Sequence, residues 1–173
     1  MDHVENSVRA LRQTLGSAVR AVETYRGQTT LVLEPAGLLP ACAQLHEDPA
    51  LGFELLAALT AVDHWPQEPR FSVVYQFYHI ARRCFLGLRV PLPGDDAVLP
   101  SVETIYPNAN WHEREVYDMF GIQFTGHSDL RRILMPYDWQ GHPLRKDYPL
   151  GYEEVQFSFN HEEIDRRKPY ARE

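Results

Sequence analysis

The sequence predicts an α+β protein, a two-layer sandwich in which helices pack on a mixed sheet. Two segments carry apolar residues at helical spacing, and several runs between and after them alternate or are rich in Val, Phe and Tyr. The predicted order is α-β-β-α-β-β-β, which differs from the strand–helix alternation of a nucleotide-binding sheet. With 173 residues, the chain is long enough to bury the core of one such domain.

Apolar spacing defines each expected element in chain order. The helices repeat apolar side chains every three or four residues, whereas the strands alternate. The expected elements are a helix at 2–15, strands at 18–25 and 29–33, a helix at 35–46, a stretch at 53–62 that fits a strand or a helix, and strands at 71–80 and 83–90. Only Ala81 and Arg82 separate the last two strands, which indicates an antiparallel hairpin.

A connector rich in Pro, Gly and Asp at 92–99 leads into a short helical region. A short helix is expected from Ser101 to Tyr106, because Pro107 prevents its continuation. Together with the next helix, this region completes an α+β domain that we expect to span residues 1–124.

The next helix is charged and has clear sequence signals at both ends. Asn110 is expected to accept a hydrogen bond from a helical amide while Glu113 reaches back, as in a capping box, and Gly121 ends the helix. Arg114 and Asp118 lie four residues apart and are expected to pair.

Residues 125–173 are expected to form an irregular, aromatic-rich C-terminal arm. No apolar period persists there, and four prolines interrupt any helix. The aromatic side chains pack either on the body of the domain or on another protein, and exposed aromatic and Arg side chains are typical of interface cores. We expect the arm to dock on partner subunits, with residues 151–173 ordered only on the partner.

Charge and cysteine content argue against several classes of protein. A net charge of −7 disfavours nucleic-acid binding, which needs clustered Lys and Arg. The two cysteines, Cys42 and Cys84, are too few for an iron–sulfur cluster held by this chain alone, and both are expected to be buried. The longest uncharged apolar stretch, at 55–62, is too short to span a bilayer.

Two stretches of the sequence resemble catalytic motifs, but each lacks a residue that its motif requires. The sequence after His112 begins like the zinc motif HExxH, but Val116 occupies the position of the second ligand. The stretch at 121–128 resembles a phosphate-binding loop, yet His127 replaces the required lysine and the stretch follows a helix. We therefore expect no catalytic, cofactor-binding or metal-binding residue in this chain. A free-standing enzyme with a metal held by dispersed His and carboxylate side chains is the alternative.

Residues 111–150 concentrate charges of both signs, with six acidic and five basic side chains. Aromatic residues are interleaved among these charges, which favours a network of paired, partly buried ions over a solvated charged face.

At these residues the sequence resembles a known family. The run 113–121 (EREVYDMFG), then His127 and Arg131, and the run 132–149 (RILMPYDWQGHPLRKDYP) are similar to the signature of the 30 kDa (C-type) subunit of the proton-pumping NADH:quinone oxidoreductase, respiratory complex I. The similarity is dense over residues 100–150 and looser over the N-terminal part.

The resemblance implies a non-redox structural or assembly subunit of the peripheral arm of that complex. The complex passes electrons from NADH through FMN and iron–sulfur clusters, all in partner subunits, to quinone and couples this to proton translocation. The resemblance also implies packing against the large quinone-site subunit and its peripheral-arm neighbours, on the cytoplasmic side of the inner cell membrane and without a membrane span.

The same resemblance leaves a related assembly open, a ferredoxin–plastoquinone or membrane-bound hydrogenase complex. The expected interface residues are those of the signature: Glu113, Arg114, Glu115, Asp118, His127, Arg131, Arg132, Trp139, Arg145, Lys146 and Asp147.

Overall fold

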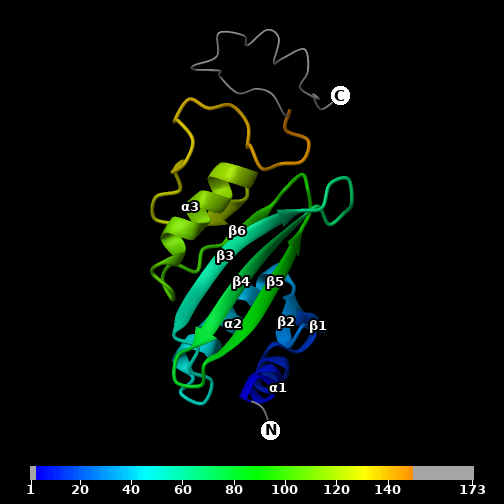
Figure 1. Cartoon of the computed structure of the whole chain (residues 1–173), viewed down its shortest axis with the longest axis vertical. Helices are drawn as coiled ribbons and strands as arrows, with labels where there is room; N and C mark the ends of the chain where they lie inside the picture. The colour runs from blue at the N-terminus through cyan, green and yellow to red at the C-terminus, as the bar shows by residue number, and fades with distance from the viewer. Residues whose placement is uncertain (1–2, 150–173) are drawn as a thin grey trace.

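Residues 3–149 are described by the computed structural model, in which a five-stranded sheet is the central element (Figure 1). The elements are α1 (His3–Leu15), β1 (Val19–Tyr25), β2 (Gln28–Leu33), α2 (Leu38–Glu47), β3 (Leu55–Asp63), β4 (Phe71–His79), β5 (Cys84–Leu92), β6 (Val98–Pro100), α3 (Ala109–Phe120) and β7 (Gln123–Thr125), with 3-10 turns at Gly16–Ala18 and Pro35–Gly37. The α+β class and the mixed sheet are as predicted. The expectations for residues 151–173 lie outside the described residues.

The sheet has the strand order β1-β2-β5-β4-β3. Neighbouring strands are antiparallel except β2 and β5, which pair in parallel and make the sheet mixed. The predicted hairpin is confirmed, because Phe71 to His79 pair in antiparallel register with Leu92 to Cys84. The undecided stretch at 53–62 contributes the edge strand β3.

One face of the sheet is buried beneath α1 and α2, which lie behind it in Figure 1. Alternate residues of β4 point into this core, among them Phe71, Tyr75 and Phe77, all fully buried. Cys42 of α2 is buried there as expected, whereas Cys84 is only half-buried. The burial of these aromatic and aliphatic side chains is the main stabilising contribution to the domain.

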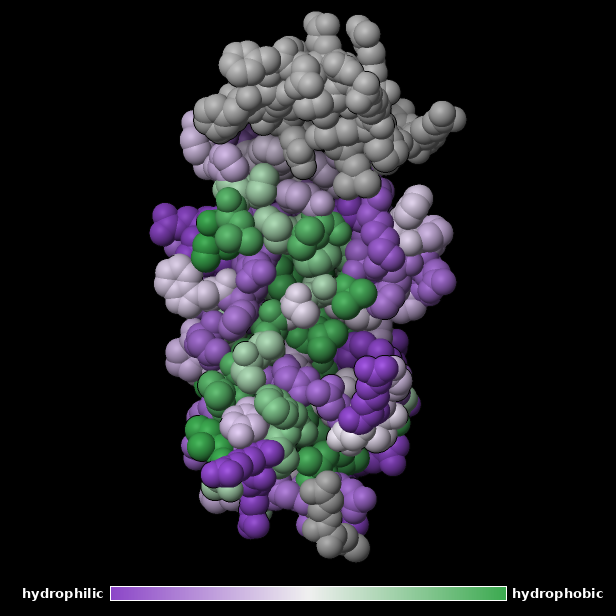
Figure 2. Space-filling model, in the orientation of Figure 1, coloured by the Kyte–Doolittle hydropathy of each residue, from purple (hydrophilic) through white to green (hydrophobic). Residues whose placement is uncertain are grey.

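Within residues 3–149, no helix covers the opposite face of the sheet (Figure 1). Figure 2 shows a strip of apolar residues along this side of the molecule. Leu55, Val62 and Phe85, on β3 and β5, each remain about two-fifths exposed. None of the helices within residues 3–149 has the length and apolar character needed to cross a membrane.

A smaller unit of β6, α3 and β7 lies beside β3 (Figure 1). It is held there by two polar side chains whose acceptors belong to the stretch at the start of β3: the Tyr106 hydroxyl donates to the Phe53 carbonyl, and the Asn108 amide donates to the Leu56 carbonyl, each at 2.8 Å. A carbonyl of this edge strand is thereby satisfied by the neighbouring unit.

The prediction of a short helix between Ser101 and Tyr106 is wrong. This stretch forms a turn, in which the amides of Ile105 and Tyr106 both donate to the carbonyl of Val102. Pro107 stops further helical bonding, and the Ser101 hydroxyl and Val102 amide are occupied by Glu113 instead.

The contact between β2 and β5 requires a glycine, which gives a first prediction. A Cβ at Gly87 would lie 2.6 Å from the Thr30 hydroxyl on the paired strand. Gly87→Ala is expected to lower the free energy of unfolding by about 1–3 kcal/mol, measured by urea denaturation. The double variant with Thr30→Ala should regain part of the loss. A Gly87→Ala protein that unfolds at the wild-type urea concentration would contradict this packing.

Candidate functional site

Residues 126–149 contain no helix or strand, yet they fold back on the body of the domain. Two buried carboxylates of the body bind this segment, Asp63 at the end of β3 and Asp118 on α3, and a third, Glu113 on α3, lies near its His127. Each has a different set of hydrogen-bond donors, and together they define the candidate site.

Asp118 fixes the centre of the segment. Its side chain is fully buried, and Oδ2 accepts hydrogen bonds from the backbone amides of Ile133, Leu134 and Met135 at 3.0, 2.8 and 2.8 Å. Oδ1 accepts from Arg132 Nη1 at 2.6 Å. Burial alone would raise the pKa of the Asp118 carboxyl, but the amides and the guanidinium together hold its pKa below the usual value.

Arg132 extends this fixation along the segment. Its Nη2 donates to the main-chain carbonyls of Trp139 and Gly141, each at 2.9 Å, while Nη1 is bound to Asp118. The planar guanidinium therefore joins α3 to two points of an otherwise irregular loop. The Trp139 indole Nε1 is buried and has no hydrogen-bond partner within the described residues.

The C-terminal end of α3 is capped by the same segment. Gly121 ends the helix in the left-handed conformation, as expected, with φ of 75°. The carbonyls of the last turn then accept from residues 142–145: Asp118 from His142 Nδ1, Met119 from the Leu144 amide and Phe120 from Arg145 Nε, at 3.0, 3.0 and 2.6 Å. The segment thus supplies donors to carbonyls that lack partners within the helix.

Asp63 receives the end of the segment. Its Oδ2 accepts from the Lys146 amide at 2.8 Å and from Arg70 at 2.9 Å, and Arg70 also pairs with Asp147 at 2.6 Å. Burial would raise the pKa of Asp63, but Arg70 and the amides of Lys146 and Trp65 lower it to about 2. One arginine therefore bridges β3 and the segment across a buried carboxylate.

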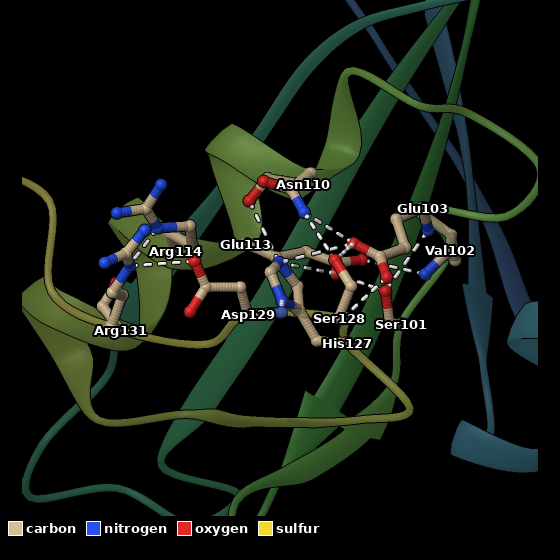
Figure 3. A network of polar contacts seen from close by, with 10 residues as sticks. All are labelled: Ser101, Val102, Glu103, Asn110, Glu113, Arg114, His127, Ser128, Asp129 and Arg131. Atoms are coloured by element: carbon tan, nitrogen blue, oxygen red, sulfur yellow. Dashed lines mark hydrogen bonds and ion pairs between the residues drawn. The ribbon is translucent and has the colours of Figure 1, made fainter.

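Glu113 occupies a separate buried site at the other end of α3 (Figure 3). Its carboxylate is fully buried and accepts from the Ser101 hydroxyl at 2.6 Å and the Val102 amide at 2.8 Å. Burial raises the pKa of Glu113, because these two neutral donors compensate for the lost hydration less well than a guanidinium would.

His127 connects this site to the start of the segment (Figure 3). Its Nε2 lies 3.7 Å from a Glu103 oxygen and 3.9 Å from a Glu113 oxygen. Nδ1 accepts from the Asp129 amide at 3.0 Å, so Nε2 carries the hydrogen and donates to the Asn110 carbonyl at 3.1 Å. The backbone contacts thereby select one neutral tautomer.

The predicted capping box is wrong. Helix α3 begins at Ala109, one residue before the expected cap, and its N-cap Asn108 makes no side-chain cap bond. The Asn110 amide group donates to Glu103 at 2.7 Å, and Glu113 points into the protein. The two side chains satisfy tertiary partners in place of the helix end.

The predicted pairing of Arg114 with Asp118 is also wrong, because Asp118 pairs with Arg132. Arg114 instead donates to the carbonyls of Arg131 and Arg132, at 3.1 and 3.2 Å, and its guanidinium lies 5.2 Å from the Trp111 ring. The orientation of the two side chains on α3 places Asp118 in the core and Arg114 toward the surface.

The other expected interface residues divide into those that the site brings together and those that it leaves outside. Arg132, Trp139, Arg145, Lys146 and Asp147 gather around Asp118 and Asp63, and His127 lies beside Glu113. Arg131 pairs with Asp129 at 2.8 Å on the surface. The Glu115 side chain is exposed and makes no hydrogen bond or ion pair with another described residue.

Sequence reasoning missed Asp63, Arg70, Ser101 and Glu103. Asp63 and Lys146 are separated by 83 positions, so local spacing carries no signal for their contact. The only available signal was a lone carboxylate at the end of an apolar strand. Within residues 3–149, no group of three His, Cys, Asp or Glu side chains is placed to hold a metal ion.

The fold is shared with chains of known structure. The fragment 1–134 of Nqo5 matches with a TM-score of 0.63 and 29% identity, covering 75% of this chain and 100% of that fragment. A chain of the membrane-bound sulfane sulfur reductase, an archaeal respiratory membrane complex, matches with a TM-score of 0.70, covering 84% of this chain and 85% of that one. Its identity of 24% shows the fold alone. These similarities define the fold, which this chain shares with Nqo5 and with a chain of that archaeal complex.

Sequence comparison identifies the family within this fold. Residues 31–154 match the family described as "Respiratory-chain NADH dehydrogenase, 30 Kd subunit". The C-type subunit of NADH-quinone oxidoreductase from Roseiflexus sp. (strain RS-1) is 45% identical over 163 residues, which is 94% of each chain. Its counterpart from Herpetosiphon aurantiacus is 44% identical over 147 residues, covering 85% of this chain and 86% of the relative. The chain belongs to the 30 kDa subunit family, which confirms the resemblance seen in the sequence.

The depressed pKa of Asp63 predicts a dependence of stability on acid. Since its folded pKa of about 2 lies below the ordinary value, its ionic contacts stabilise the protein above about pH 4 and are lost as the pH falls toward 2. This contribution is roughly 2–3 kcal/mol. Asp63→Asn should therefore lose stability at pH 7, and the gap from wild type should narrow between pH 5 and 2 in urea titrations.

The matched control for this prediction is Glu115→Gln, which removes an exposed carboxylate without described partners. Its difference from wild type should stay small at every pH. A gap between Asp63→Asn and wild type that is constant from pH 7 to 2 would contradict the assigned role of the carboxylate.

Proposed function

We propose that this chain is a non-redox structural and assembly subunit of the peripheral arm of an NADH-quinone oxidoreductase. It binds the large quinone-site subunit and neighbouring peripheral-arm subunits, on the cytoplasmic side of the inner membrane and without a span of its own. FMN and the iron–sulfur clusters belong to the partner subunits. In this role the chain supports electron transfer from NADH to quinone, coupled to proton translocation, by holding subunits in place.

One structural observation supports this proposal in addition to family membership. The irregular segment 126–149 is held in place by hydrogen bonds, yet large apolar side chains on and beside it are exposed. Buried Asp118 and Asp63 fix the segment through backbone amides. The exposed fractions are 61% for Trp111, 62% for Leu134 and 94% for Tyr137. A surface whose backbone is already ordered loses little entropy on binding, as suits a permanent contact between subunits.

Two alternatives to this function can be distinguished by the proteins and metals that co-purify with the chain. An equivalent member of a related ferredoxin–plastoquinone or hydrogenase-type assembly would recover different electron-input proteins. The likeness to the sulfane sulfur reductase chain is one of fold, while the relatives from Roseiflexus and Herpetosiphon are both named as NADH-quinone oxidoreductase subunits. A free-standing metal-dependent enzyme would be recovered alone and with bound metal.

The direct experiment is purification of the affinity-tagged full chain from membranes in mild detergent. We expect it to recover NADH:quinone reductase activity together with flavin and iron–sulfur clusters. A tagged wild-type chain that fractionates alone would contradict the proposed function.

A second expectation concerns the chain by itself. If FMN and the iron–sulfur clusters belong to partner subunits, as proposed, the purified isolated subunit should absorb only in the aromatic region. Elemental analysis should find no stoichiometric iron. A flavin band or iron that persists through gel filtration would contradict the non-redox role.

The fixation of the segment should matter for assembly more than for chemistry. Asp118→Asn leaves the Arg132 guanidinium without its carboxylate, and breaking a buried pair costs about 3–5 kcal/mol. The yield of assembled complex should fall several-fold, whereas quinone reduction per flavin in the remaining complex stays near wild type. Glu47→Gln, an exposed change at the end of α2, serves as the control with normal yield. Normal yield with abolished turnover for Asp118→Asn would indicate a direct catalytic role instead.

A further inference from the structure

A groove lies between α3 and the segment that Asp118 fixes. It has a volume of about 300 Å³ and is lined by Tyr117, Leu130, Arg131, Arg132, Met135 and Tyr137. We call it the Tyr137 groove. Its shape is fixed from beneath, because Asp118 binds both the Arg132 guanidinium and the Met135 amide. The groove is therefore a preformed feature of the folded chain.

Arginine side chains border the groove: Arg131 and Arg132 line it, and Arg114 lies beside Arg131. Arg114 and Arg131 lie next to each other (Figure 3), with Arg114 Nε bound to the Arg131 carbonyl. Arg114 forms no ion pair with any described residue, because its donors are used on neutral carbonyls. Among the described residues Arg131 pairs with Asp129 alone, and these side chains are 74% and 50% exposed. A pair so exposed is worth ~0–1 kcal/mol and leaves both partners free to exchange.

These arginines belong to a chain whose net charge is −7. The third arginine, Arg132, is neutralised by buried Asp118. Glu115 is the remaining acidic side chain on the outer face of α3, and it pairs with neither Arg114 nor Arg131. Arg114, unpaired within residues 3–149, and weakly paired Arg131 are thus the groups available to an acidic ligand, with the exposed carboxylate of Asp138 following Tyr137.

The apolar lining specifies the rest of the ligand. Leu130 and Met135 are partly buried and pack against the core, so they form a fixed apolar wall. The Tyr137 ring, 94% exposed, stands at the open side. Aromatic, Met and Arg side chains around a pocket are the composition of interface hot spots. An apolar side chain in the groove would bury surface that the folded chain leaves open to water.

We propose that the Tyr137 groove binds an acidic segment of a partner subunit. A carboxylate of the segment pairs with Arg114 and Arg131, and an adjacent apolar side chain fills the space between Leu130, Met135 and Tyr137. This inference rests on the proposed function and deepens it, since it names the chemistry that the partner presents.

The first test locates the occupant by cross-linking. Tyr137 is replaced by the photo-reactive amino acid p-benzoylphenylalanine in the tagged full chain, and the complex is irradiated in membranes before purification and mass spectrometry. The expected product joins position 137 to a peptide of another subunit that is rich in Asp and Glu. The same replacement at exposed Tyr25, distant on the β1–β2 turn, is the matched control and should not give that product.

Three cross-linking outcomes would overturn the inference: a product with residues 150–173 of the same chain, a product with a second copy, or a product with a neutral or basic partner peptide. Each names a different occupant of the groove. If the tagged wild-type chain recovers no other subunit at all, the proposed function itself has failed. Recovery of the complex with any of these three products refutes the acidic-segment inference alone.

The second test reverses a charge. Arg131→Glu changes an exposed side chain and keeps the main-chain carbonyl that Arg114 binds, so the isolated variant should melt at the wild-type temperature. Retention of the partner should fall roughly tenfold, with a weaker dependence on salt. Replacing the cross-linked Asp or Glu of the partner with Lys should restore retention of the partner by Arg131→Glu.

Arg12→Glu, on the exposed side of α1, makes the same charge change away from the groove and should retain the partner normally. Undiminished retention by Arg131→Glu would overturn the inference. A loss that the partner's reversed charge does not restore would also overturn it.

Discussion

The buried carboxylate of Asp118 is the interaction on which the remainder of the site depends. A charge removed from water is costly unless strong donors replace its hydration. Here three successive backbone amides and one guanidinium do so. The amides must converge on a single oxygen, so the backbone of residues 133–135 is held in one conformation. Arg132, fixed by the same carboxylate, then positions the loop at 139–141.

The three buried carboxylates differ in how they are compensated. Asp63 and Asp118 each bind an arginine as well as backbone amides, and their pKa values are lowered. Glu113 has a hydroxyl and one amide as its donors, and its pKa is raised by burial. The pKa is therefore lowered where a guanidinium binds the carboxylate and raised where none does. The guanidinium also separates their roles: the arginine-paired carboxylates join distant segments, whereas Glu113 organises the turn that leads into its own helix.

The sequence was sufficient for features set by local pattern. Apolar spacing located α1 and α2, alternation located the β4–β5 hairpin, and Gly121 marked the end of α3. The sequence-based prediction failed where a side chain could bind either a partner close in sequence or one distant in sequence. Asn110 and Glu113 fit a capping box by spacing, but buried tertiary donors and acceptors compete more strongly than a solvent-exposed helix end.

The candidate site was predictable as a region but not as a set of pairs. The density of mixed charges at 111–150 correctly indicated a network, and the signature placed it in a family. The partners were not readable, because Asp118 pairs with Arg132 rather than with Arg114 and because Asp63 and Arg70 lie far away in sequence. Pairings of this kind are set by the fold, and a single sequence carries no local trace of them.

The chain order of these contacts has a consequence for biosynthesis. Asp63 and Asp118 both precede the segment that they bind, and Lys146 meets Asp63 across 83 positions. On the ribosome, β3 and α3 therefore emerge before the donors that neutralise their carboxylates. Closing so long a loop is entropically slow until the body has formed. The two carboxylates therefore gain their full set of donors only after residues 132–146 have been synthesised.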